Sequence, residues 1–66
     1  LMWFNPLEYP NFIYAYCDAG LEGTSWRETF KAMGFKTHRF DFWRDFYDGN
    51  SWLDEHEFTF FVLRYS

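Results

Sequence analysis

Five carboxylates lie between residues 45 and 57, and no lysine or arginine interrupts them: Asp45, Asp48, Asp54, Glu55 and Glu57. Four large aromatic residues accompany them: Trp43, Phe46, Tyr47 and Trp52. Carboxylates spaced along a rigid surface can imitate the charge of a nucleic acid and steer a chain into the basic groove of a partner protein. Tryptophan and tyrosine are enriched at the energetic centres of protein interfaces. These nine residues are therefore the predicted partner-binding site, and an inhibitor or nucleic-acid-mimicking decoy is one function that they suit.

The acidic segment also has a simpler interpretation. Without residues 45–57 the chain has five acidic and six basic residues, so the net charge of −4 comes from this one stretch. Surface charge keeps a small apolar protein in solution without serving any partner. The sequence leaves both interpretations open.

Direct binding of nucleic acid is not expected. Surfaces that stack bases combine aromatic rings with lysine and arginine, because neutralising phosphates supplies most of the affinity. Three basic residues, Lys36, Arg39 and Arg44, lie near one another in the sequence, but aspartates lie beside them. A single-stranded nucleic-acid binder is therefore only the third alternative.

Metal binding and catalysis have little support in the residue pattern. Cys17, His38 and His56 are potential ligands, yet there is no C-x-x-C or H-x-x-x-H spacing. A nucleophilic cysteine needs a base and a setting that stabilises its thiolate, and no motif supplies either around Cys17. A chain of 66 residues also has little room for a substrate pocket. We predict no catalytic residue, no metal and no cofactor, and hence not an enzyme.

The length and composition indicate one small domain over residues 1–66. Aromatic residues make up 29% of the chain, more than a core of this size needs, so some rings should be exposed or covered by another molecule. Cys17 is the one cysteine, which excludes an internal disulfide and fits the reducing cytoplasm. We expect no signal peptide, and the uncharged run over residues 9–17 is too short to span a membrane.

Sequence periodicity predicts one helix and three strands. Residues 1–10 contain both prolines and should form an extended apolar arm. Residues 24–33 should form a helix, capped by Ser25 with Glu28 and ended by Gly34. Alternating side chains favour strands over residues 11–17, 35–43 and 57–65. Residues 44–56 remain as an acidic, aromatic link.

These elements predict an α+β fold, with a three-stranded mixed sheet in β-α-β-β order and one amphipathic helix on one face. This order is half of a split β-α-β arrangement. One helix covers one face only, whereas the first and third strands are apolar on both. The uncovered face should bind another molecule. We therefore expect a non-catalytic protein-binding module, with a homodimer joined through the surplus aromatic residues as the alternative. By analogy of composition, a phage or mobile element is a suitable source for such an inhibitor.

Overall fold

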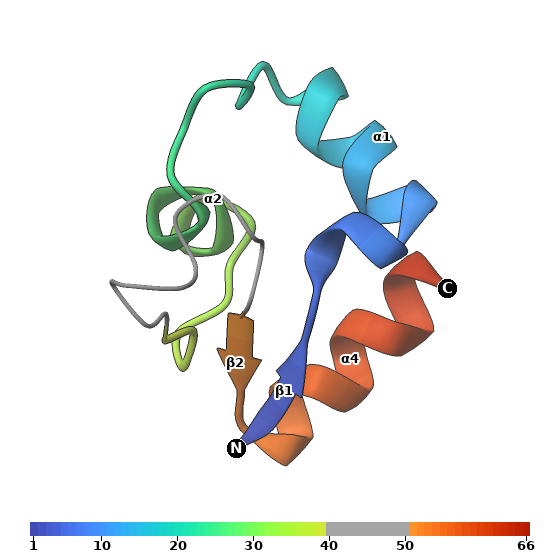
Figure 1. The fold of residues 1–66 in the computed structure, drawn as a ribbon, viewed down its shortest axis with the longest axis vertical. Coiled ribbons are helices and arrows are strands. Elements are labelled where there is room, and N and C mark those ends of the chain that lie inside the picture. The colour runs from blue at the N-terminus through green and yellow to red at the C-terminus, as the bar shows by residue number, and fades with distance from the viewer. Residues whose placement is uncertain (40–50) are drawn as a thin grey trace.

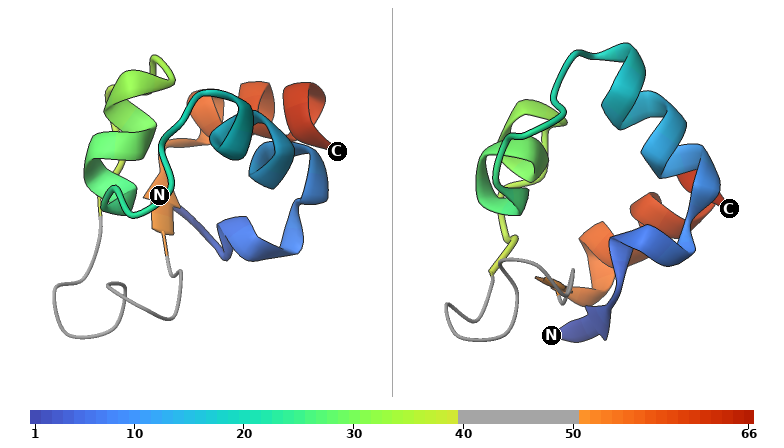
Figure 2. Two further views of the ribbon diagram at one scale, coloured as in Figure 1. Left: turned by 90° about the horizontal axis from the view of Figure 1, so that it is seen from above. Right: turned by 45° about the horizontal axis from the view of Figure 1, so that its top comes forward.

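The computed structural model describes residues 1–39 and 51–66. Their elements in order are strand β1 (Met2–Phe4), the 3-10 turn η1 (Pro6–Glu8), helix α1 (Pro10–Asp18), helix α2 (Trp26–Ala32), strand β2 (Ser51–Leu53) and helix α4 (Glu55–Tyr65). Figure 1 shows the two short strands side by side, with α1 and α4 to one side of them and α2 to the other. The view from above in Figure 2 keeps the same arrangement.

The small sheet joins the first residues of the chain to the segment before α4. β1 and β2 are antiparallel, and Trp3 is opposite Trp52 in their register. Phe4 and Leu53 are buried beneath the sheet, whereas Trp3 is 55% exposed. Arg39 extends the pairing as an isolated bridge, because it exchanges two backbone hydrogen bonds with Trp52, of 3.0 and 3.1 Å. The predicted extended arm is thus correct for β1, but it turns into η1 at Pro6.

The predicted three-stranded mixed sheet with one helix is wrong. Residues 11–17 and 57–65, both predicted as strands, belong to helices α1 and α4, and the described residues contain a two-stranded antiparallel sheet. Within the second predicted strand, 35–43, only the bridge at Arg39 is extended pairing among the residues described, and 40–43 lie outside them. The described residues therefore do not form the uncovered sheet face that was expected as a docking surface.

Both helices resemble strands in the sequence because runs that are apolar at nearly every position satisfy a period of 2 and of 3.6 equally well. In α4 the side chains turned to the core recur with helical spacing at Phe58, Phe61, Val62 and Tyr65. In α1 the same spacing relates Phe12, Ile13 and, before the helix, Tyr9. The opposite side of each helix is also apolar in part, and this produces the false alternation.

Local signals fix where α1 and α4 begin. Pro10 occupies the first turn of α1, where a residue without a backbone N–H costs nothing. At α4, the Asp54 side chain accepts a hydrogen bond from the backbone N–H of Glu57, at 2.8 Å. Acids fill the first turn of α4 and Arg64 lies in its last turn, an arrangement that complements the helix dipole.

The predicted helix over residues 24–33 is confirmed as α2. Its N-cap is Ser25, whose hydroxyl accepts from the backbone N–H of Glu28 at 3.3 Å. Gly34 ends it with φ of 93°, which a residue with a side chain rarely adopts. The N–H of Phe35 then donates to the carbonyl of Phe30 and that of Gly34 to Lys31, which is the Schellman pattern.

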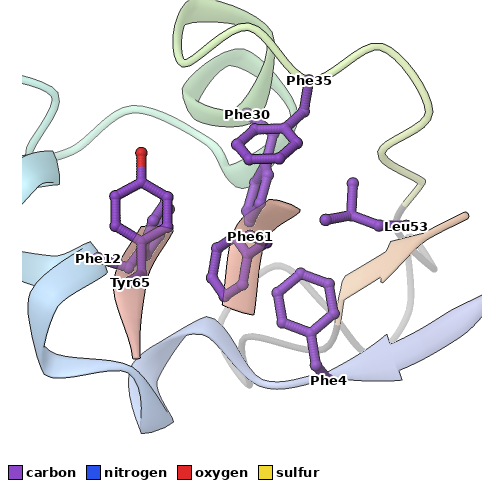
Figure 3. Packing of buried hydrophobic residues seen from close by; sticks show 7 residues of the cluster. All are labelled: Phe4, Phe12, Phe30, Phe35, Leu53, Phe61 and Tyr65. Atoms are coloured by element: carbon purple, nitrogen blue, oxygen red, sulfur yellow. The ribbon is translucent and has the colours of Figure 1, made fainter. Parts of the chain in front are cut away.

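Phe61 is at the centre of the core. Its ring centroid is 4.8 Å from that of Phe4 in β1 and 5.1 Å from those of Phe12 in α1 and Tyr65 in α4. Figure 3 shows these rings converging from different elements, and the buried set is Phe4, Phe12, Phe30, Phe35, Leu53, Phe61 and Tyr65. Tilted and edge-on contacts of this kind add about 0.5–1.5 kcal/mol per pair to the gain from burial. Six of these seven residues are aromatic, so the core consists mainly of rings.

Candidate functional site

The predicted partner-binding site is only partly covered by the described residues. Five of its members lie outside them: Trp43, Asp45, Phe46, Tyr47 and Asp48. The other four are in β2 and around the start of α4: Trp52, Asp54, Glu55 and Glu57. The structure therefore gives a role to the second half of the acidic segment alone.

Glu57 holds the chain after α2 against the start of α4. Its carboxylate accepts hydrogen bonds from the backbone N–H groups of Lys36, at 3.0 and 3.1 Å, and of Thr37, at 2.8 Å, and from the Thr37 hydroxyl. Desolvation alone would raise the pKa of this carboxyl. The hydrogen bonds from Thr37 and Lys36, together with the Lys36 charge, outweigh that effect and lower the pKa. Glu57 is thus an internal clamp rather than a freely projecting charge.

Asp54 is also used within the chain. It caps α4, and its backbone N–H donates to the Thr37 hydroxyl at 3.2 Å, so it joins the network that Glu57 forms. Glu55 is exposed, and it lines a shallow hollow of ≈520 Å³ together with Asp54 and His56. Among the three carboxylates of the acidic segment that the structure describes, Asp54 and Glu57 accept hydrogen bonds within the chain, whereas no such bond is seen for Glu55 among the described residues. Binding of a partner through the acidic segment stays a prediction.

Trp52 is half-buried in the sheet. Its backbone pairs with Trp3 on one side and with Arg39 on the other. Residues opposite each other across an antiparallel pair extend to the same face, so Trp52 shares its face with Trp3. This face of the sheet therefore has two tryptophans, while Phe4, although it belongs to the extended arm, is in the core. Contact of Trp52 with a partner stays a prediction.

His38 is packed between the core and β2. Its ring stacks on Phe30, with centroids 4.3 Å apart, and its Nε2 is 3.0 Å from the Ser51 hydroxyl. Burial, and then the positive charge of Arg27, lower the pKa of His38 from 6.5 to about 4. His38 is therefore a neutral, structural ring at pH 7 and not a charged ligand-binding group.

Cys17 is exposed near the end of α1. Desolvation and the carboxylates of Glu22 and Asp18 raise the pKa of its thiol, which disfavours the nucleophilic thiolate. Among residues 1–39 and 51–66, no three side chains of the metal-binding types gather in one place. In the same ranges, no helix has the length and apolar character needed to cross a bilayer.

A groove lies between the end of α2 and the outer face of α4, and the most exposed apolar side chains of α4 line it. Its volume is ≈480 Å³, and its lining contains Met33, Phe35, Phe60 and Leu63, together with Gly34, Glu57 and Arg64. Phe60 is 65% exposed and Leu63 76% exposed. We call this hollow the apolar groove.

A second groove adjoins it on the α2 side. It has a volume of ≈500 Å³, and its lining contains Arg27, Lys31, Lys36 and His38, together with Gly34 and Phe35. No carboxylate belongs to this lining within the described chain. Three of the six lysines and arginines of the protein thus meet in one place, although its net charge is −4. We call this hollow the basic groove.

Sequence reasoning missed the apolar groove because it took residues 57–65 as a strand. A strand that is apolar on both faces does not distinguish Phe60 from its buried neighbours, whereas in α4 Phe60 lies on the outer face of the helix. Asp54 followed three residues later by Glu57 is a capping-box pattern, and it would have revealed α4. Phe60 and Leu63, opposite the core stripe, would then have appeared as an exposed pair.

Comparisons with known proteins return no match: no family model, no curated protein and no solved structure corresponds to this chain.

Proposed function

We propose that this chain is a non-catalytic protein-binding module whose apolar groove receives an apolar side chain of a partner. The observation that carries the proposal is the exposure of Phe60 and Leu63, which line a hollow together with Met33 and Phe35. Apolar groups that adjoin a cleft mark interaction sites more often than scattered ones do.

The energetics favour such a contact. Removing a Phe or Leu side chain from water contributes about 1.5–3 kcal/mol, and neither Phe60 nor Leu63 makes this gain within the fold. Two other lining side chains are already held in place, since Phe35 is buried against Phe30 and Met33 is packed against the core. A preformed site loses little conformational entropy on binding.

The acidic decoy predicted from residues 45–57 is not needed for this proposal. Asp54 and Glu57 serve within the chain, which leaves fewer carboxylates for a partner than the sequence suggests. We propose the cytoplasm as the compartment, because Cys17 is exposed, and a single accessible thiol would be prone to oxidation elsewhere.

A random peptide display library selected on the immobilised protein tests the proposal. We expect enriched peptides that share an aromatic or large aliphatic anchor and bind in the micromolar range. Leu63→Ser should weaken their binding at least tenfold. Leu7→Ser is the matched control, because Leu7 is 54% exposed in η1 and does not line the groove. No enrichment, or equal loss in both variants, would reject the apolar groove as the binding site.

A second copy of the chain is the other occupant to consider. Sedimentation at several concentrations detects a dimer, and its loss in Leu63→Ser, with retention in Leu7→Ser, would replace the foreign partner with a homodimer. A monomer at every concentration would reject the homodimer.

A further inference from the structure

The apolar and basic grooves are neighbours that share two residues. Gly34 and Phe35 line both of them, so the turn after α2 forms the boundary. A ligand that enters the apolar groove beside Phe35 therefore meets the basic groove within a short distance. The two hollows together offer an apolar contact and a positive field along one surface.

The described lining of the basic groove contains three basic side chains and no carboxylate. Arg27 and Lys31 are four residues apart, and so lie on the same side of α2, and Lys36 joins them after the turn. Arg27 and His38 line the same groove, and the Arg27 charge is, after burial, a cause of the lowered pKa of His38. Glu57 contacts Lys36, but its oxygens already accept hydrogen bonds from the backbone N–H groups of Lys36 and Thr37. Glu28, which follows Arg27 in α2, is exposed and does not belong to the lining.

We infer that the partner segment is an acidic peptide, in which a carboxylate that seats among Arg27, Lys31 and Lys36 accompanies the apolar anchor beside Phe60 and Leu63. This inference rests on the proposed function and adds the chemical class of the partner. It also reverses the polarity of the decoy hypothesis, since here the basic groove belongs to this protein and the acidic group to its partner.

A peptide suits the paired grooves better than a nucleic acid does. A long polyanion is repelled by a chain with a net charge of −4, whereas a short acidic segment experiences mainly the local field, because salt screens charges beyond about 10 Å. The adjoining apolar groove also has no counterpart in a phosphate backbone. A peptide with an apolar side chain near an acidic one presents a matching group to each hollow.

The test uses the same display selection with a charge-reversed variant. Peptides selected on the wild-type protein should be enriched in Asp and Glu near the anchor. For the best peptide, Arg27→Glu should raise the dissociation constant roughly tenfold, and 0.5 M salt should weaken binding to a similar degree, at about 1.4 kcal/mol per tenfold. Arg27 is exposed in the first turn of α2, where an acid is tolerated, so the variant should fold.

Arg39→Glu is the matched control. It makes the same change in net charge on an exposed side chain outside the lining of the basic groove, and it keeps the backbone bonds to Trp52. We expect less than a twofold effect. Anchored peptides that lack acidic enrichment, or that bind Arg27→Glu as well as the wild type, would overturn the inference while leaving the proposed function standing. Absence of any Leu63-dependent peptide would reject the proposed function itself. Salt-sensitive binding of a labelled single-stranded oligonucleotide in place of peptides would overturn the acidic-peptide assignment.

Discussion

The imidazole of His38 lies flat on the phenyl ring of Phe30, with the two ring planes 3° from parallel. Phe30 is fully buried, so this stack places an ionisable ring at the border of the core. Ser51 supplies a hydroxyl to Nε2, while Nδ1 is buried without a partner among the residues described. Protonation would add a charge to a site that already faces Arg27, and the stability of the fold should therefore depend on pH.

We predict that acid destabilises the protein as pH falls from about 6.5 toward 4. The pKa of His38 is about 4 in the folded protein, whereas a histidine surrounded by water has a pKa of 6.5, so the unfolded chain binds more protons between these values. The free energy of unfolding should thus be highest above pH 6.5 and decline through this window. Urea denaturation at a series of pH values measures it, and His38→Gln should flatten the slope. An equally steep slope in the variant would assign the effect to other groups.

The field of Arg27 at His38 gives a separate prediction. Arg27→Gln removes a positive charge and should raise the pKa of His38 above about 4, but not to 6.5, because burial is the larger cause of the shift. The titration of the His38 ring protons by NMR measures the change. Arg39→Gln removes the same charge from an exposed side chain outside the basic groove and serves as the control. An unchanged pKa in Arg27→Gln would mean that its field is screened by solvent.

Glu57→Gln should destabilise the protein by about 1–2 kcal/mol. The variant replaces the carboxylate that accepts hydrogen bonds from two backbone N–H groups and from the Thr37 hydroxyl with a neutral amide. Because the site is partly exposed, these hydrogen bonds contribute less stability than buried ones to a charged group. The pKa of Glu57 is lowered by folding, so its contribution is present above pH 4.5 and is lost as pH falls further. Chemical denaturation at pH 7 measures the loss. Glu55→Gln, an exposed change in the same helical turn, should have little effect; equal losses would refute the clamp.

Two adjacent phenylalanines in α4 should respond very differently to truncation. Phe61→Ala removes the ring at the centre of the core and should lower the free energy of unfolding by about 3–5 kcal/mol. In a domain this small, such a loss should leave most of the molecules unfolded. Phe60→Ala removes a ring that is 65% exposed and should change stability by less than about 0.5 kcal/mol. Circular dichroism during thermal unfolding compares them. A large loss in Phe60→Ala would place that ring in the core.

How much of this fold could be predicted from the sequence depended on local signals. Ser25 with Glu28 and the glycine at position 34 specify α2 through hydrogen bonds between near neighbours, and the prediction of that helix is confirmed. The start of α4 has an equally local signal in Asp54 and Glu57, but the apolar alternation after it favoured a strand. Helix boundaries of this kind can be predicted from the sequence because the capping hydrogen bonds join residues within four positions of each other.

The rest could not be predicted because it depends on contacts between distant residues. Glu57 resembles a surface acid until the fold brings the backbone of Lys36 and Thr37 to its carboxylate. The basic groove likewise needs the turn at Gly34 to bring Lys36 beside Arg27. In the apolar runs, the period of 2 and the period of 3.6 compete evenly, and tertiary packing decides between them. These site residues therefore became visible only with the three-dimensional arrangement.

The antiparallel pairing of β1 with β2 has a consequence for the order of folding. It joins the segments Met2–Phe4 and Ser51–Leu53, so the chain loses the entropy of closing a long loop before the strands gain any hydrogen bond. The helices, whose caps are local, can form within microseconds, whereas strand pairing must await a collision of distant segments. The pairing of β1 with β2 should thus form late in folding. Substitutions that weaken it should accelerate unfolding and leave the refolding rate nearly unchanged.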